Sequence, residues 1–288
     1  MTRVFRLLLL AVSLIPSICS AEGETVDDEK ARRRNEQLQK KFQEQAESYE
    51  FTVAGNDQPL ILLPKPVFHW LNRARVKQVS VHYGAVYVWT RQGRAEAVGT
   101  IFSVSSEKEP PAFYHEFHSL ATVPLKAKSD GAIKWDTPDP GLKFAPFIKS
   151  DRPGDTPARR LAEMRAMARR FTGYSNNYDD TRWQLNLLPQ PLYRMPESTG
   201  EVLDQAVFAL ISTAGTDPEV LLVIEATKVK DGFQWHYALC RFTDLQTYVS
   251  LDDVEVWSFA NGTKGAFNEA GPTKPYRFLS AGTIPLEE

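Results

Sequence analysis

The chain has 288 residues and a formal net charge of −2 at pH 7, with 34 Lys and Arg residues against 36 Asp and Glu residues. This balance argues against a nucleic-acid partner or a dedicated surface for anionic membranes, because both need concentrated basic charge. Hydrophobic residues make up 42% and aromatic residues 11% of the chain, which is ample for the buried core of one large domain or two small ones.

Residues 1–21 are typical of a cleavable secretory signal peptide. Two arginines precede an apolar run over residues 7–18, which is shorter than the about 20 residues of a membrane-spanning helix. Small residues at the boundary predict cleavage after Ala21 and export to the periplasm or the exterior. Lipidation of Cys19 is an alternative that the bulky Ile18 disfavours, and an uncleaved N-terminal anchor is another.

Cleavage would leave Cys240 as the only cysteine, so no intrachain disulfide can form and packing must stabilise the exported fold. Cys240 lies in an apolar run, and we interpret it as a small buried hydrophobic residue rather than a nucleophile. No later apolar run is long enough to cross a bilayer, so we expect no integral membrane span after signal cleavage.

Residues 24–49 form a charged run of helix-forming residues with a narrow apolar stripe that includes Leu38 and Phe42. The stripe predicts a surface helix that packs on a sheet, with a short coiled-coil arm as the alternative. From residue 60 to residue 125 the hydrophobic period changes to 2, which is typical of strands. The elements expected here are a hairpin of residues 85–91 and 95–104 around a tight turn at 91–94, followed by a strand at 112–120.

Residues 126–157 are rich in Pro, Asp, Gly and Lys, and this composition indicates a connector. Asp155 or Thr156 can cap a helix over residues 158–171, with Pro157 in its first turn. Further strands are expected near residues 184–193, 206–212, 220–227 and 234–242.

Three sequence matches at nearly one offset predict an internal duplication, with chance likeness between two β-rich stretches as the alternative. The matches are LLPKPVF at 62–68 with LLPQPLY at 187–193, AVY at 85–87 with AVF at 206–208, and YH at 114–115 with WH at 235–236. The expected fold is α+β, with two similar, pseudo-symmetric units that are each a helix followed by an antiparallel meander. The units span residues 22–125 and 158–258, and residues 259–288 are expected to be a flexible tail.

The paired prolines of each LLPxP segment indicate a structural role. They are two residues apart, so both missing N–H groups lie on the same edge of a strand. A central strand cannot lose two donors on one side, and each segment is therefore expected to be an edge strand or a bulge.

The runs LLPQPLYR at 187–194, GTDPEVLLVIEA at 215–226 and WHYAL at 235–239 resemble a family of uncharacterised exported proteins from planctomycete-type bacteria. The likeness extends over about residues 67–257. It implies export and a bacterial source. Because that family has no assigned activity, the resemblance implies no catalytic residue.

The run HEFH is the first candidate for chemistry. In a strand Glu116 and His118 share a face, so they could form an acid/base pair, or half of a metal site completed by His82 or His69. A hydrogen-bonded polar pair or an exposed face is the plainer alternative. His115 points to the opposite face, so His115 and His118 cannot both reach one ion from a regular strand.

His115 and His236 occupy matched positions, and both could bind a ligand at a pseudo-twofold axis; packing beside an aromatic neighbour is the alternative. Glu225 ends an apolar run and could be a buried carboxylate, although a strand-end residue turned to solvent is the favoured interpretation. We expect no metal and no cofactor, since GxSxG, CxxC and phosphate-binding glycine motifs are missing. A non-enzymatic binding or structural module of the cell envelope is therefore favoured. The alternative is a hydrolase-like enzyme that uses Glu116 and His118 in a cleft between the units.

Overall fold

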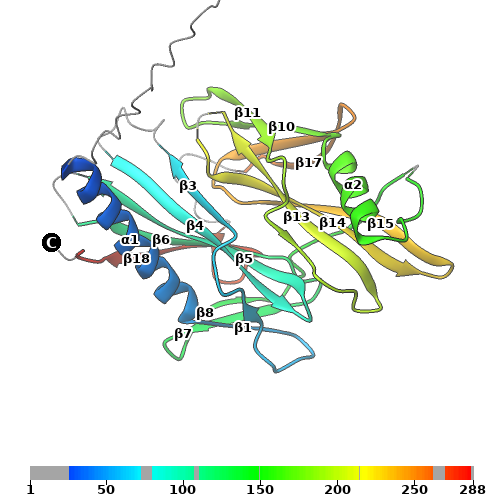
Figure 1. Ribbon diagram of the computed structural model, residues 1–288, viewed down its shortest axis with the longest axis horizontal. Coiled ribbons are helices and arrows are strands. Elements are labelled where there is room, and N and C mark those ends of the chain that lie inside the picture. Colours follow the sequence, from blue (N-terminus) through cyan, green and yellow to red (C-terminus); the bar gives the residue numbers. More distant parts are fainter. Residues whose placement is uncertain are drawn as a thin grey trace, which may run out of the picture.

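The computed structural model describes residues 26–72, 80–106, 110–148, 150–213, 215–261 and 270–286 (Figure 1). The predicted signal peptide, its cleavage site and Cys19 lie outside these described residues. Among the helices of the described residues, none has the length and apolar character needed to cross a membrane.

Strands dominate the described chain, which also has the helices α1 (Val26–Glu47) and α2 (Pro157–Ala168). The strands before α2 are β1 (Tyr49–Val53), β2 (Ile61–Leu62), β3 (Phe68–Asn72), β4 (Ser80–Arg91), β5 (Arg94–Ser106), β6 (Ala112–Ser119), β7 (Leu125–Ser129), β8 (Ala132–Thr137) and β9 (Ala145–Pro146). Those after α2 are β10 (Phe171–Asn176), β11 (Arg182–Leu187), β12 (Tyr193–Arg194), β13 (Val202–Ser212), β14 (Pro218–Val229), β15 (Gly232–Arg241), β16 (Gln246–Leu251), β17 (Val254–Phe259) and β18 (Tyr276–Thr283).

The strands form three antiparallel sheets. A small sheet has the strand order β1-β7-β8. A six-stranded sheet has the order β18-β6-β5-β4-β2, with β3 also paired to β4. A nine-stranded sheet has the order β17-β16-β10-β11-β13-β14-β15-β9, with β12 also paired to β13.

The two large sheets pack face to face, and each carries one helix on its outer side (Figure 1). Alternate residues of β4 join different cores, because side chains of a strand point to opposite faces. Tyr87 packs on the side of α1, whereas Val86 and Val88 pack between the sheets. In β14, Leu222 packs on the side of α2 and Leu221 packs between the sheets. Both faces of each sheet are therefore covered.

The apolar stripe of α1 packs on the six-stranded sheet, which confirms the predicted surface helix. Leu38, Phe42 and Ala46 are buried. Phe42 meets Phe113 of β6 edge to face, with 5.7 Å between the ring centroids. Fully burying one large apolar side chain stabilises a fold by about 1.5–3 kcal/mol, so this stripe anchors the helix.

Two local predictions are also confirmed. The Thr156 hydroxyl accepts the N–H of Arg159 at 3.2 Å and caps α2, with Pro157 as its first residue. The hairpin of β4 and β5 turns at Gln92 and Gly93, whose positive φ angles of 51° and 79° suit a two-residue hairpin turn. Neighbouring residues alone therefore determine where these elements begin and turn.

Both LLPxP segments step out of their sheets as bulges. The N–H groups of Leu63 and Val67 donate to carbonyls of β4 at 3.0 and 2.8 Å. Those of Leu188 and Leu192 donate to carbonyls of β13 at 2.9 and 2.7 Å. The prolines lie between these bonds, where the ladder needs no donor, and the expected bulge is confirmed.

The predicted α+β fold of two pseudo-symmetric helix-plus-meander units is wrong. Strands make up 53% and helices 14% of the structure, in large antiparallel sheets. The expected connector contributes β9, which pairs with β15, and the expected flexible tail contributes β18, which pairs with β6. The physical reason is that β4, β13 and β14 are apolar on both faces. The two large sheets therefore share one inner core instead of each closing on its own helix.

Candidate functional site

A cavity of about 530 Å³ lies between the two large sheets, and we call it the acidic cavity. The six-stranded sheet supplies lining residues from β3, β4, β5, β6 and β18. The nine-stranded sheet supplies the β10–β11 loop, the start of β14 and the segment after β15. The titratable lining residues are His82, Tyr114, Glu116, Tyr178, Asp217, Asp244 and Tyr276, and no Lys or Arg occurs among the described lining residues.

Aromatic rings form a continuous wall of the acidic cavity. The ring centroids of Trp70 and Phe102 are 5.4 Å apart, those of Phe102 and Tyr114 are 5.4 Å apart, and those of Tyr114 and Phe278 are 5.6 Å apart. The indole N–H of Trp70 donates to Thr100 Oγ1 at 2.9 Å, so its polar atom is satisfied inside the wall. These contacts hold the rings in fixed positions.

Three carboxyl groups enter the acidic cavity from different elements. Glu116 Oε1 on β6 accepts the hydroxyl of Tyr276 at 2.5 Å. Asp217 Oδ1 accepts the side-chain amide of Asn72 at 3.1 Å, and Asp244 Oδ2 accepts a tyrosine hydroxyl of the β10–β11 loop. Each of these three bonds comes from a neutral donor, which positions the carboxyl group.

The Glu116 carboxyl is 8% exposed, and burial raises its pKa to about 8. The hydrogen bond from Tyr276 opposes this rise in the pKa, whereas the carboxylates of Asp244 and Asp217 add to it, and the Arg241 cation lowers it. At neutral pH most molecules therefore hold Glu116 as a neutral acid.

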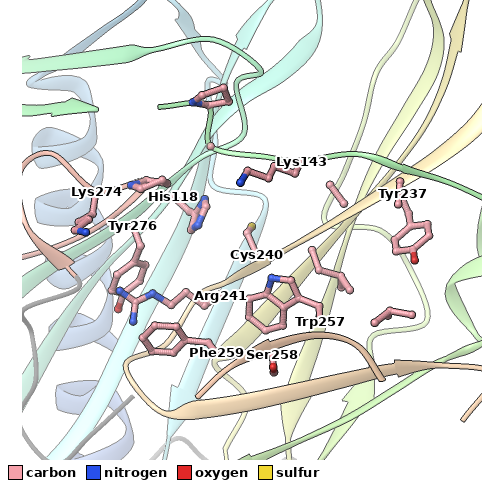
Figure 2. Close-up of a pocket in the computed structure, with 17 residues that line it drawn as sticks. His118, Lys143, Tyr237, Cys240, Arg241, Trp257, Ser258, Phe259, Lys274 and Tyr276 are labelled. Carbon is pink, nitrogen blue, oxygen red and sulfur yellow. The ribbon is translucent and has the colours of Figure 1, made fainter. Parts of the chain in front are cut away.

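A second cavity, of about 390 Å³, lies between β15, β17, the segment before β9 and the start of β18 (Figure 2). We call it the basic cavity because its charged lining residues are Lys143, Arg241 and Lys274, with no Asp or Glu among the described lining residues. Arg241 is 6% exposed. Its guanidinium carbon lies 3.8 Å from the ring centroid of Phe259 and 3.9 Å from that of Tyr276. Figure 2 shows the side chain of Arg241 beside these two rings.

Tyr276 separates the two cavities and lines both. Its hydroxyl donates to Glu116 on one side, and its ring stacks on Arg241 on the other. In the ladder of β18 and β6 it lies directly opposite His118. Burial raises the pKa of Tyr276 well above its usual range, so its hydroxyl stays a neutral donor.

Glu116 and His118 share a face of β6, as predicted, but the structure does not assemble them into a pair. Glu116 lines the acidic cavity and His118 lines the basic cavity. His118 Nδ1 bonds instead to the carbonyl oxygen of Ser119 at 2.8 Å. Burial lowers the pKa of His118 to about 4, so its imidazole is neutral at pH 7. Proton transfer between the two side chains has no direct route.

His115 and His236 lie on different sheets with separate partners. Nδ1 of His115 accepts the hydroxyl of Tyr49 at 2.7 Å, and its Nε2 lies 2.6 Å from Gln45 Oε1, which joins the sheet to α1. Burial lowers the pKa of His115 to about 4. His236 Nδ1 lies 2.8 Å from Thr227 Oγ1 on the neighbouring strand. The two histidines therefore form no common binding site.

Neither histidine proposed to complete a metal site does so. His69 is exposed and stacks on Tyr83, and His82 lines the acidic cavity. Within the part of the chain that the structure describes, no three His, Cys, Asp or Glu side chains lie together so that they could hold a metal ion.

The favoured interpretation of Glu225 as a solvent-turned residue is wrong. Glu225 is 3% exposed, and its Oε2 accepts Nε and a terminal nitrogen of Arg94 at 3.2 and 3.1 Å. Gln205 donates to the same oxygen at 3.1 Å. The counter-charge comes from the β4–β5 hairpin, far away in the sequence.

Sequence reasoning missed Tyr276, Arg241, Asp217 and Asp244. Tyr276 lies in the segment that was expected to be a flexible tail, and Arg241 lies in the apolar run of Cys240, where no binding residue was expected; both Tyr276 and Arg241 line the basic cavity. The sequence offers one local signal for Asp217 and Asp244, which is their position next to the ends of strands. Asp217 comes just before β14, and Asp244 comes shortly after β15.

No family model, curated protein or solved structure matches the chain. The geometry of the two cavities therefore carries the functional conclusion.

Proposed function

We propose that the mature chain is an exported, non-enzymatic module that binds a small organic cation in the acidic cavity. The observation that supports this most directly is that Asp217 and Asp244, together with the protonated Glu116, line one aromatic-walled cavity of about 530 Å³. Ligand pockets typically have volumes of about 300–1,000 Å³ and combine apolar walls with a few polar groups. The leader sequence and the resemblance to exported proteins support a location outside the cytoplasm.

The chemistry of the walls favours a positive charge. At an effective dielectric constant of 20, a cation about 4 Å from one carboxylate gains about 4 kcal/mol. A ring face within about 6 Å adds about 0.5–2 kcal/mol, and the wall from Trp70 to Phe278 presents several rings. An alkylated ammonium group uses both kinds of contact, since its carbon atoms pack on rings while its charge attracts carboxylates.

The same geometry supports an organic cation more than a metal ion. A metal ion needs several ligating atoms at about 2–2.6 Å around one point, and in the described residues no such group exists. The three carboxyl groups instead belong to β6, the residue before β14 and the segment after β15, and each accepts a hydrogen bond from a different donor. These groups line a cavity whose volume, about 530 Å³, suits a small organic molecule.

The hydrolase-like alternative has less support. It needs Glu116 and His118 to exchange a proton through one substrate or water. These two side chains line different cavities, and the Tyr276 ring, which lines both, lies opposite His118. A binding function requires no such exchange.

Isothermal titration calorimetry with choline and with 3,3-dimethyl-1-butanol, its neutral isostere, tests this proposal. We expect the purified mature chain to bind choline at least 10-fold more tightly than the alcohol, because only choline carries the charge. The double variant Asp217→Asn/Asp244→Asn should lose most of the difference. Its amides keep the shape of the side chains and can still accept the bonds from Asn72 and the tyrosine hydroxyl.

Asp151→Asn, at an exposed site outside the cavity lining, is the matched control and should bind choline as the wild type does. Thermal unfolding of each variant checks that it is folded. The proposal is refuted if choline binds no better than the alcohol, if neither binds, or if the double variant binds choline unchanged.

A further inference from the structure

The charged residues of the basic cavity come from three separate elements. Arg241 ends β15, Lys143 precedes β9, and Lys274 precedes β18. The whole chain has slightly more acidic than basic residues, yet no Asp or Glu occurs among the described residues that line this cavity. Three cations on the lining of one cavity raise the local concentration of anions inside a partly enclosed space.

Arg241 is held in one orientation. Its guanidinium lies between the rings of Phe259 and Tyr276, at 3.8 and 3.9 Å from their centroids, and the residue is more than nine-tenths buried. Figure 2 shows this stack beside His118 and Lys274. A planar guanidinium fixed in this way needs little ordering to accept a planar oxyanion.

The remaining lining of the basic cavity is largely apolar and uncharged. Leu239, Cys240 and Trp257 lie next to Arg241, and Figure 2 places Cys240 and Trp257 in the middle of the cavity. Cys240 is 3% exposed, and burial raises the pKa of its thiol, so it packs as an uncharged side chain. A ligand here therefore meets both positive charge and apolar surface.

We infer that the basic cavity is a second ligand site, which binds a small aromatic acid in its anionic form. The carboxylate or sulfonate group lies against Arg241 and the two lysines, and the flat ring packs on Trp257 and Leu239. The volume of about 390 Å³ is within the usual range of ligand pockets. The site is separate from the acidic cavity and does not depend on the function proposed for that cavity.

The test uses 8-anilinonaphthalene-1-sulfonate, an aromatic anion whose fluorescence rises on binding, with benzoate and benzyl alcohol as competitors. In the mature chain we expect saturable binding that benzoate displaces and benzyl alcohol does not. The double variant Lys143→Glu/Lys274→Glu reverses two exposed charges without removing a buried group. It should weaken the benzoate-displaceable binding at least 10-fold.

The matched control is Lys65→Glu/Lys128→Glu, which reverses two exposed charges outside this cavity and should change the affinity less than twofold. Asp217→Asn/Asp244→Asn should not weaken benzoate binding, because those residues line the other cavity and the change removes only negative charge. Four results would each overturn the inference. They are no benzoate-displaceable signal in the wild type, equal displacement by benzyl alcohol, unchanged binding in the Lys143/Lys274 variant, or loss of binding in the Asp217/Asp244 variant.

Discussion

Replacing Glu116 with Gln isolates the contribution of one buried carboxyl group to the pH dependence of folding. Burial raises the pKa of Glu116 to about 8 in the folded chain, whereas a glutamate in an unfolded chain titrates at about 4.3. At a pH between these two pKa values, Glu116 keeps its proton in the folded state and has lost it in the unfolded state. The contribution of Glu116 to the free energy of unfolding therefore falls as the pH rises from about 5 to about 8.

The expected size of this effect follows from the span between the two pKa values. Each pH unit inside it lowers the free energy of unfolding by about 1.4 kcal/mol, so about three units give about 4 kcal/mol. The Glu116→Gln variant keeps an acceptor for the Tyr276 hydroxyl but cannot titrate. His115 and His118 titrate in both proteins, so their contributions cancel when the two are subtracted.

Urea unfolding of the wild type and of Glu116→Gln at pH values from about 5 to about 8 measures the effect. The unfolding free energy of the wild type minus that of the variant should fall by about 4 kcal/mol across this range. Glu50→Gln, at an exposed site of β1, is the control and should give a difference constant to within about 0.5 kcal/mol. A constant difference for Glu116→Gln as well would show that Glu116 is ionised throughout and would refute the reasoning.

Three further predictions concern the stability of the folded chain. Arg94→Met leaves Glu225 buried without its cation and should lower the free energy of unfolding in urea by about 3–5 kcal/mol. The exposed Arg32→Met should lower it by less than about 1 kcal/mol, and an equal loss in the two variants would contradict the prediction. Gly141→Ala places a Cβ 1.9 Å from a carbonyl oxygen at the end of β6, so a loss of about 1–3 kcal/mol is expected, and an unchanged melting temperature would exclude the close approach. Because burial lowers the pKa of His118 to about 4, stability should fall as the pH drops from about 6.5 to about 4, and His118→Gln should weaken that dependence in thermal unfolding.

Signals between near neighbours in the sequence predicted both helices and most of the long strands, but few of the short strands. The Thr156 cap fixes the start of α2, the turn at Gln92 and Gly93 fixes a hairpin, and the stripe through Phe42 fixes the buried side of α1. Each depends on side chains within a few residues, where backbone geometry alone decides which groups meet.

The candidate sites could not be predicted in the same way, because their contacts join distant segments. Tyr276 and Glu116 are 160 residues apart, and Arg94 and Glu225 are 131 residues apart. Apolar alternation showed that β4 and β14 are strands but not that their inner faces would meet. Glu116 could be identified as a candidate because of its face on the strand, whereas its partner depended on a strand in the expected tail.

The position of β18 also determines when the two cavities can form during synthesis of the chain. Residues of β18 line both cavities, whose other lining residues begin at Trp70 in the acidic cavity and at His118 in the basic cavity, so neither cavity exists until the chain is made almost to its end. Contacts this distant in sequence form late and slow the folding of β-rich chains. A chain still emerging from the ribosome therefore cannot hold either of the ligands proposed above. Binding of those ligands would begin only after the last strand has docked.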